Sequence, residues 1–141
     1  MARTYRTTLF RRVGNAAIGR VLRVLPVGPY ALLTVRGRTT GQPRTTPVRV
    51  MSHGGARYLV APYGPVPWVL NLRAAGEVSL RQGRRSATHV VVECAPDEAG
   101  PVLKDYARAE PITRPYFDAS PSDPPEAFAA EAARHPVFRL A

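Results

Sequence analysis

The sequence has few residues that bind metals or form disulfides. Its single cysteine, Cys94, excludes an intramolecular disulfide framework and a zinc site built from several cysteines. The three histidines, His53, His89 and His135, lie far apart and lack the spacing of metal ligands. Metal catalysis therefore has no support in the sequence, and we expect Cys94 to be a small core residue rather than a nucleophile.

Long apolar stretches are also missing. No apolar run is long enough to span a bilayer, and the N-terminus lacks the continuous apolar core of a secretory signal, so we expect a cytoplasmic protein. Fifteen prolines and eleven glycines divide the 141 residues into short elements, which disfavours a long helical bundle. A hydrophobic content of 45% is enough for a buried core. These properties favour a single strand-rich or α+β domain.

Acidic residues are absent from the first half of the chain. No Asp or Glu precedes Glu77, whereas arginines recur from Arg3 to Arg73, and the formal net charge is +10. Such a surface attracts anions. Nucleic acid, anionic lipid and a phosphorylated cofactor are all compatible with it.

What the sequence does contain is a group of cations and hydroxyls between two apolar segments. The stretch LLTVRGRTTGQPRTTPVRV, from Leu32 to Val50, is typical of two β-strands joined by a turn that contains Gly37, Gly41 and Pro43. Arginine matches pairs of phosphate or carboxylate oxygens, and threonine adds a further donor. The turn is therefore either a solvated hairpin tip or a binding site for an anion.

The N-terminal segment has the pattern of a basic amphipathic helix, from Arg3 to Leu25, that ends at Pro26. This helix either packs its apolar side on the rest of the protein or lies at an anionic membrane surface as a peripheral anchor. The expected organisation is the helix at residues 1–26 followed by one domain at residues 27–141.

The rest of the chain mixes strand and helix patterns. Strands are expected at about 30–35, 45–51, 57–61, 78–80, 86–92 and 137–140, and helices at about 68–75, 96–109 and 126–134. Pro67 suits the first turn of a helix and Gly76 its end, and this helix places Trp68 and Asn71 on one face. The proline-rich segment from Glu110 to Pro125 is expected to be an irregular loop and a candidate lid.

Two motifs resemble those of a known family. The run GRTTGQPRTTPV is similar to the G-R-x-(S/T)-G-x-x-R-x-x-P signature of the deazaflavin-dependent nitroreductase family, and PWVLNL is similar to its P-x-W-x-x-N-L motif. The ending HPVFRL also resembles the family's last strand, so the likeness extends from Tyr30 to Leu140. It implies a mainly β fold with helices (α+β), a split β-barrel of six to seven antiparallel strands with the N-terminal helix and two to three further helices, shared with flavin-mononucleotide-binding oxidases.

The resemblance also implies the cofactor, which is coenzyme F420, an 8-hydroxy-5-deazaflavin with a flat ring at one end and a phosphodiester and glutamates at the other. The implied cofactor-binding residues are Arg38, Thr39, Arg44, Thr45, Thr46, Pro47, Ala61, Pro62, Tyr63, Gly64, Pro67, Trp68, Val69, Leu70 and Asn71. Arg36 and Arg49 are given less weight, because strand alternation can point them away from the site. The sequence departs from the family pattern at Thr39 and at Pro62–Tyr63, where lysine is frequent in the family. The departures imply that the anionic tail is bound more weakly or in a different arrangement.

The implied reaction is hydride transfer between the reduced deazaflavin and an electron-poor small molecule, such as an activated alkene, a quinone or a nitro compound. No side chain is assigned as catalytic, since solvent can protonate the product. Tyr30, Tyr63 and Tyr116 are candidates for contact with the substrate. The protein is expected to be a monomer or a homodimer.

Two alternatives remain open at this point. The first keeps the barrel and replaces the deazaflavin with flavin mononucleotide or haem. The second is a basic nucleic-acid-binding module in which Tyr5, Tyr30 and Tyr58 stack on bases. Because no known nucleic-acid-binding motif is present and the aromatic residues are not interleaved with the arginines, we do not expect nucleic acid as a partner.

Overall fold

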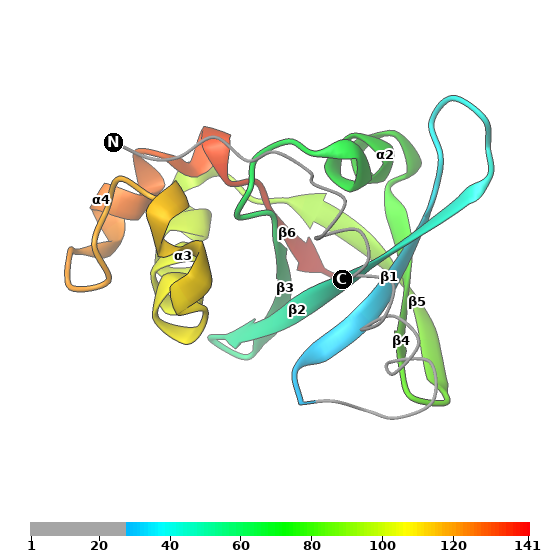
Figure 1. Ribbon diagram of the computed structural model, residues 1–141, viewed down its shortest axis with the longest axis horizontal. Helices are drawn as coiled ribbons and strands as arrows, with labels where there is room; N and C mark the ends of the chain where they lie inside the picture. The colour runs from blue at the N-terminus through cyan, green and yellow to red at the C-terminus, as the bar shows by residue number, and fades with distance from the viewer. Residues whose placement is uncertain (1–27) are drawn as a thin grey trace.

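Six antiparallel strands form a closed barrel in a computed structural model that describes residues 28–141 (Figure 1). The strands are β1 (Tyr30–Arg36), β2 (Pro43–His53), β3 (Ala56–Val60), β4 (Glu77–Gln82), β5 (Arg85–Glu93) and β6 (Val137–Leu140). Their order around the barrel is β1-β2-β3-β6-β5-β4. The expected N-terminal helix lies outside the described residues.

The barrel interior explains the alternation in the strand sequences. Ala31, Leu33 and Val35 alternate along β1 and all belong to the core cluster inside the barrel, together with Leu59 and Phe138. On β5 the same alternation leaves Val91 packed against this cluster and turns its neighbours outward. Side chains at every second position of β1 and β5 therefore fill the inside of the barrel.

Helix α2 (Pro67–Ala75) lies beside the loop that joins β1 and β2 (Figure 1). It begins with Pro67 in its first turn and ends at Gly76, which has a φ of 73° and donates its N–H to the Leu72 carbonyl at 2.8 Å. Both features confirm the sequence prediction. Val69 and Leu72 anchor the helix in the barrel core, so its other side is available to line a site.

A second layer packs against the outside of the barrel. It consists of α3 (Pro96–Ala109), η1 (Pro111–Tyr116), α4 (Pro125–Ala129) and η2 (Ala132–Arg134). Leu103 and Phe128 are fully buried between these helices and the strands. A side chain at Gly100 would meet the Pro125 carbonyl oxygen at 2.6 Å, so glycine is required where α4 approaches α3.

The fold class predicted from the sequence is confirmed, with two corrections in detail. Residues 111–116 form a 3-10 helix rather than an irregular loop, since Pro111 occupies a first helical position and Pro115 still permits i to i+3 bonding. The predicted last helix is divided into α4 and η2. No helix among residues 28–141 is long and apolar enough to cross a membrane.

Candidate active site

A cleft of about 810 Å³ runs along strand β2. Its walls come from the β1–β2 loop, the segment that leads into α2, the end of α3 and the start of η1. Loops and element ends therefore supply most of the cleft wall, while the barrel fixes their positions. The cleft has the size of a cofactor site.

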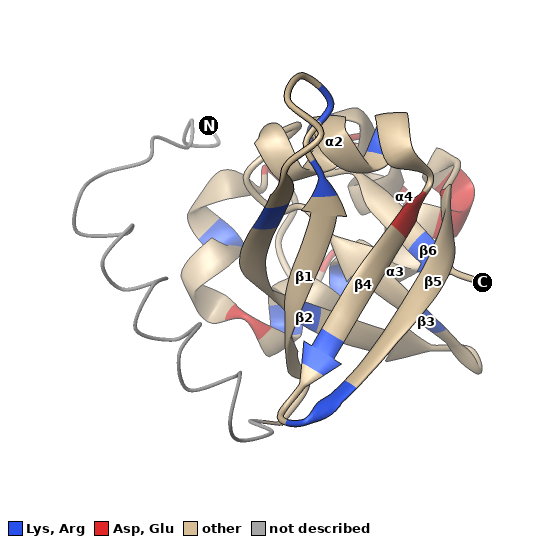
Figure 2. Cartoon of the chain, turned by 90° about the vertical axis from the view of Figure 1, so that its right-hand side faces the viewer, with Lys and Arg blue, Asp and Glu red and all other residues tan. Residues whose placement is uncertain are grey.

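The β1–β2 loop and the start of β2 form one end of the cleft and carry Arg38 and Arg44, neither of which has an ion-pair partner in residues 28–141. Gly37 donates its N–H to the Gln42 carbonyl at 2.8 Å, and Gly41 adopts a φ of 72° that favours glycine. Arg44 and Thr39 line the cleft from this loop and from the start of β2, and both are exposed. Figure 2 shows the basic segment of this loop close to α2.

Arg38 and Asn71 join the loop to helix α2. The Asn71 Oδ1 atom accepts a hydrogen bond from the Arg38 backbone N–H at 3.0 Å and another from Arg38 Nη1 at 2.8 Å. Asn71 is 5% exposed, so this amide is a buried anchor for an exposed cation. The two residues that the sequence motifs singled out separately thus form one unit.

The middle of the cleft is largely apolar. Pro62, Tyr63, Pro67 and Trp68 line it. Trp68 lies against Phe138 of the barrel core, with 6.4 Å between ring centroids. Tyr63 stacks edge-on with Tyr116 at 4.9 Å, which connects the cleft wall to the end of η1.

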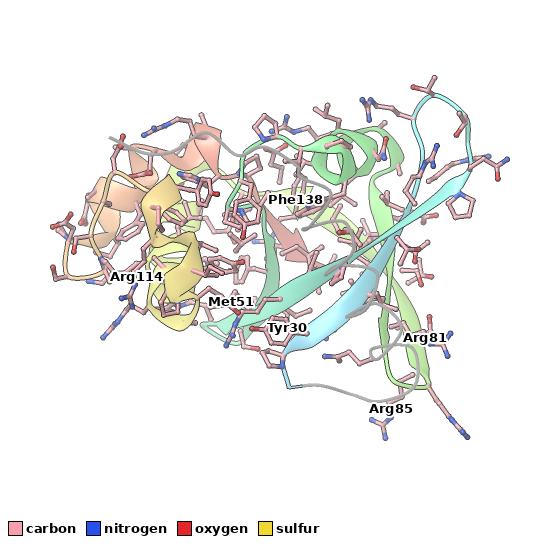
Figure 3. All side chains as sticks on the ribbon, in the orientation of Figure 1. Tyr30, Met51, Arg81, Arg85, Arg114 and Phe138 are labelled. Carbon is pink, nitrogen blue, oxygen red and sulfur yellow. The ribbon has the colours of Figure 1, made fainter. Side chains whose placement is uncertain are left out.

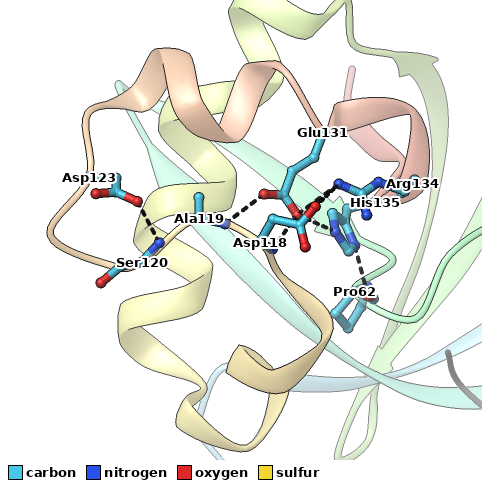
Figure 4. Close-up of polar contacts among 8 residues, drawn as sticks. All are labelled: Pro62, Asp118, Ala119, Ser120, Asp123, Glu131, Arg134 and His135. Atoms are coloured by element: carbon cyan, nitrogen blue, oxygen red, sulfur yellow. Dashed lines mark hydrogen bonds and ion pairs between the residues drawn. The ribbon is translucent and has the colours of Figure 1, made fainter. Parts of the chain in front are cut away.

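Beneath this wall a buried polar network fixes the segment that contains Pro62 (Figure 4). The Pro62 carbonyl lies 2.8 Å from His135 Nδ1, and His135 Nε2 lies 2.9 Å from Glu131 Oε1. Glu131 also accepts the backbone N–H groups of Asp118 and Ala119, at 3.0 and 2.8 Å. One buried carboxylate therefore holds both the cleft wall and the segment that follows η1.

The other end of the cleft combines Tyr30, Arg49 and Glu110. Arg49 Nη1 donates to Glu110 Oε1 at 2.8 Å, and the Tyr30 hydroxyl donates to the same oxygen. The Arg49 guanidinium carbon lies 5.7 Å from the centroid of the Tyr30 ring, which Figure 3 labels at the start of β1. The hydrogen bond to Glu110 raises the pKa of Tyr30, and burial and the Glu110 charge act in the same direction. Tyr30 is therefore a poor proton donor.

A family model described as F420H(2)-dependent quinone reductase matches residues 3–114, which is more than half of the chain. The chain belongs to the F420H(2)-dependent quinone reductase family. This membership confirms the family resemblance and makes the protein an F420-dependent oxidoreductase.

Solved structures share the fold at low sequence identity. An F420-H2 dependent reductase (FDR-A) is 23% identical, with 84% of this chain and 97% of that chain covered and a TM-score of 0.58. A structure described as a domain-swapped dimer is 21% identical, with 94% and 93% covered and a TM-score of 0.58. A heme binding protein from Mycobacterium smegmatis is 18% identical, with 97% of this chain and 52% of that chain covered and a TM-score of 0.51. At these identities the similarity establishes the fold alone.

Most of the residues predicted to bind the cofactor line the cleft of this family member. They are Arg38, Thr39, Arg44, Thr45, Thr46, Pro47, Pro62, Tyr63, Pro67, Trp68 and Asn71, and the predicted substrate contact Tyr30 joins them. Four further predicted residues, Ala61, Gly64, Val69 and Leu70, do not line it, and neither does Tyr116. Ala61 and Val69 belong to the barrel core. On helix α2, Trp68 and Asn71 lie three positions apart and both line the cleft, whereas Val69 between them faces the core.

The cleft of this F420-dependent enzyme also contains residues that the sequence did not indicate. Arg49 lines it despite the lower weight given to that residue, and Glu110, Tyr106 and Ile112 come from the end of α3 and from η1. Burial raises the pKa of Tyr106, which therefore stays neutral. The only sequence signal for this group was the general expectation that the segment after Glu110 covers a site.

Proposed function

We propose that the protein transfers a hydride from reduced F420 to a quinone, or to another flat and electron-poor acceptor, inside this cleft. The observation that carries the proposal is the difference between its two ends. Guanidinium and hydroxyl groups gather at the β1–β2 loop, while rings and a neutralised ion pair gather at the end of α3. A cofactor with an anionic tail and a flat ring therefore fits the cleft in one orientation, with its tail at the loop end and its ring toward the end of α3.

The donor set of the loop end fits the anionic part of the cofactor. Arg38 and Arg44 offer guanidinium groups, and Thr39, Thr45 and Thr46 offer hydroxyls. Neither arginine has an ion-pair partner in residues 28–141. Their charges are therefore available to phosphate or carboxylate oxygens.

The middle of the cleft fits the deazaflavin ring. Trp68 and the Pro62–Tyr63 segment present apolar and aromatic surface. Trp68 is fixed by its contact with Phe138, and the Pro62–Tyr63 segment by the His135 network. Reduced F420 supplies a hydride when it is bound. The protein's part is to hold the ring and the acceptor face to face and to keep water away from them.

The remaining space near Tyr30 and Ile112 is where we place the acceptor. Ile112 is 75% exposed although it is apolar, so it offers the cleft mouth a surface that an apolar acceptor would cover. An acceptor that receives a hydride must also gain a proton. Because the Tyr30 hydroxyl proton is directed at Glu110, we assign the proton to solvent rather than to this tyrosine.

Equilibrium binding and single-turnover reduction test the proposal. Trp68 is the only tryptophan and lines the cleft, so quenching of its fluorescence reports occupancy. We expect F420 to bind in the micromolar range or tighter, with an affinity of about −8 kcal/mol, and flavin mononucleotide and haem to bind more weakly. Reduced F420 should then be oxidised by a quinone under anaerobic conditions. Tighter binding of flavin mononucleotide or haem, or no oxidation by any quinone, alkene or nitro compound, contradicts the proposal.

A further inference from the structure

One carboxylate stands in an otherwise cationic cleft. Among the described residues that line it, Arg38, Arg44 and Arg49 are cationic and Glu110 is the only acid. Glu110 pairs with Arg49 and with neither of the other two arginines. The cleft is therefore positive at its loop end and neutral at its acceptor end.

The position of Glu110 is not explained by helix stability. It directly follows α3, where the last carbonyls carry partial negative charge and disfavour a carboxylate. Its backbone is nevertheless fixed, because its N–H donates to the Tyr106 carbonyl at 2.8 Å and its own carbonyl accepts from the Thr113 hydroxyl at 2.7 Å. The Glu110 side chain is 15% exposed and points at Arg49, which offsets the unfavourable location.

We propose that the Arg49–Glu110 pair selects acceptors by charge, so that uncharged acceptors are taken and anionic ones are rejected. This inference rests on the proposed function. An anionic acceptor would lose its hydration on entering and would find Arg49 already neutralised. An uncharged acceptor loses less hydration and still gains the apolar contacts of the cleft mouth.

The role of Glu110 is distinct from that of Tyr30. Tyr30 donates one hydrogen bond to Glu110 and supports its orientation, but it changes no charge. Glu110 changes the charge that an acceptor meets. Without this carboxylate, the Arg49 guanidinium is free to form charge-assisted hydrogen bonds with a sulfonate or carboxylate.

Glu110→Gln tests the proposal, because the amide keeps the shape and removes the charge. The two probes are 2-(hydroxymethyl)anthraquinone, which is uncharged, and anthraquinone-2-sulfonate, which is anionic. Their dissociation constants are measured by quenching of Trp68 with oxidised F420 bound, so that the anionic tail occupies the loop end, and their kcat/KM values are measured with reduced F420. We expect wild-type protein to favour the uncharged probe, and the preference to shift toward the sulfonate by about tenfold or more in the variant, as for one charge-assisted hydrogen bond.

Glu93→Gln is the matched control. Glu93 also pairs with an arginine, Arg73, at 2.7 Å, but outside the cleft. Its replacement should leave the preference between the probes unchanged. Arg49→Gln provides the opposite test, since it leaves Glu110 without its cation and should move the preference further toward the uncharged probe.

The outcomes separate this inference from the proposed function. If the Glu110→Gln variant folds and either shows the wild-type preference or loses affinity for both probes equally, selection by charge is wrong even though the enzyme reduces quinones. If the shift in preference appears in the dissociation constants while reduced F420 reduces neither probe, selection by charge is supported and the proposed reaction is wrong. Should Glu110→Gln not fold, an unchanged preference in Arg49→Gln overturns the inference by itself.

Discussion

The two ends of the cleft are built on the same pair of strands and differ in whether their arginine is paired with an acidic residue. Arg44 faces Val35 across β1 and β2, and Arg49 faces Tyr30 in the same ladder. Strand geometry places the Cα atoms of Arg44 and Arg49 roughly 16 Å apart. Arg44 has no ion-pair partner in the described chain, whereas Glu110 neutralises Arg49. Identical side chains on one strand are thus unpaired at one end of the cleft and paired with an acid at the other, and we propose that only the unpaired one binds an anion.

The largest expected effect is a loss of stability when the buried Glu131–His135 network is broken. This network fixes the cleft wall between the two ends. Glu131→Ala removes the acceptor from His135 and from the backbone N–H groups of Asp118 and Ala119. Each buried donor left unsatisfied costs about 1–3 kcal/mol, so we expect the free energy of unfolding to fall by about 3 kcal/mol or more. Urea denaturation measures it.

Arg134→Gln is the control for this prediction. Arg134 pairs with Asp118 at 2.6 Å and, more loosely, with Glu131 at 3.7 Å, but its side chain is 53% exposed and it takes no part in the hydrogen bonds of the buried network. An exposed ion pair contributes about 0–1 kcal/mol. Equal losses in the two variants would mean that the buried network has no special part in holding the cleft wall.

The next effect concerns the cationic end alone. Arg44→Ala should weaken F420 binding by about tenfold or more, because a charge-assisted hydrogen bond contributes about 1.5–3 kcal/mol. The affinity of the uncharged anthraquinone should not change. Trp68 quenching measures both.

Arg36→Ala is the matched control for Arg44. Arg36 also belongs to the β1–β2 hairpin, but it lines a neighbouring groove and not the cleft. If the two substitutions weaken F420 binding equally, the effect comes from the overall field of the protein and not from a site at Arg44.

How far the sequence predicts the site depends on how many positions separate the residues that contact each other. The Arg/Thr loop and α2 are each continuous in the chain, so turn residues, Pro67 and Gly76 predict them from local rules. The Arg38–Asn71 contact joins residues 33 positions apart, yet both were found because each belongs to a recognisable motif.

Local sequence rules could not predict the pairing of Glu110 at the acceptor end of the cleft. Glu110 meets Arg49 across 61 positions and Tyr30 across 80, and it belongs to no motif. Its role depends on how the end of α3 docks on the barrel, which is set by tertiary contacts between helices and strands. Alternation along β2 also misled the weight given to Arg49, because the cleft follows the strand and every residue from Arg44 to Arg49 lines it.

A smaller effect on F420 binding is expected when Arg38 loses its hydrogen bonds to Asn71. Asn71→Ala removes the acceptor of two Arg38 donors, and we expect F420 binding to weaken by about 1 kcal/mol because Arg38 loses its fixed orientation. A double-mutant cycle with Arg38→Gln measures the coupling. If the two substitutions are additive, Asn71 acts on the coenzyme directly and not through Arg38.

The smallest effect is expected at the neutral end, from Tyr30→Phe. The substitution removes one hydrogen bond to Glu110, so the free energy of unfolding should fall by about 1 kcal/mol at neutral pH, while F420 affinity stays unchanged. Because the folded state raises the pKa of Tyr30, the stabilisation is fully present below the ordinary tyrosine pKa of about 10 and is lost as the pH rises through the folded value. The difference between wild type and variant should therefore be constant from neutral pH to about pH 9.5 and shrink above about pH 10. Urea denaturation across this range measures it, and a difference that shrinks already near neutral pH would show that Tyr30 ionises there and that the acceptor end is not neutral.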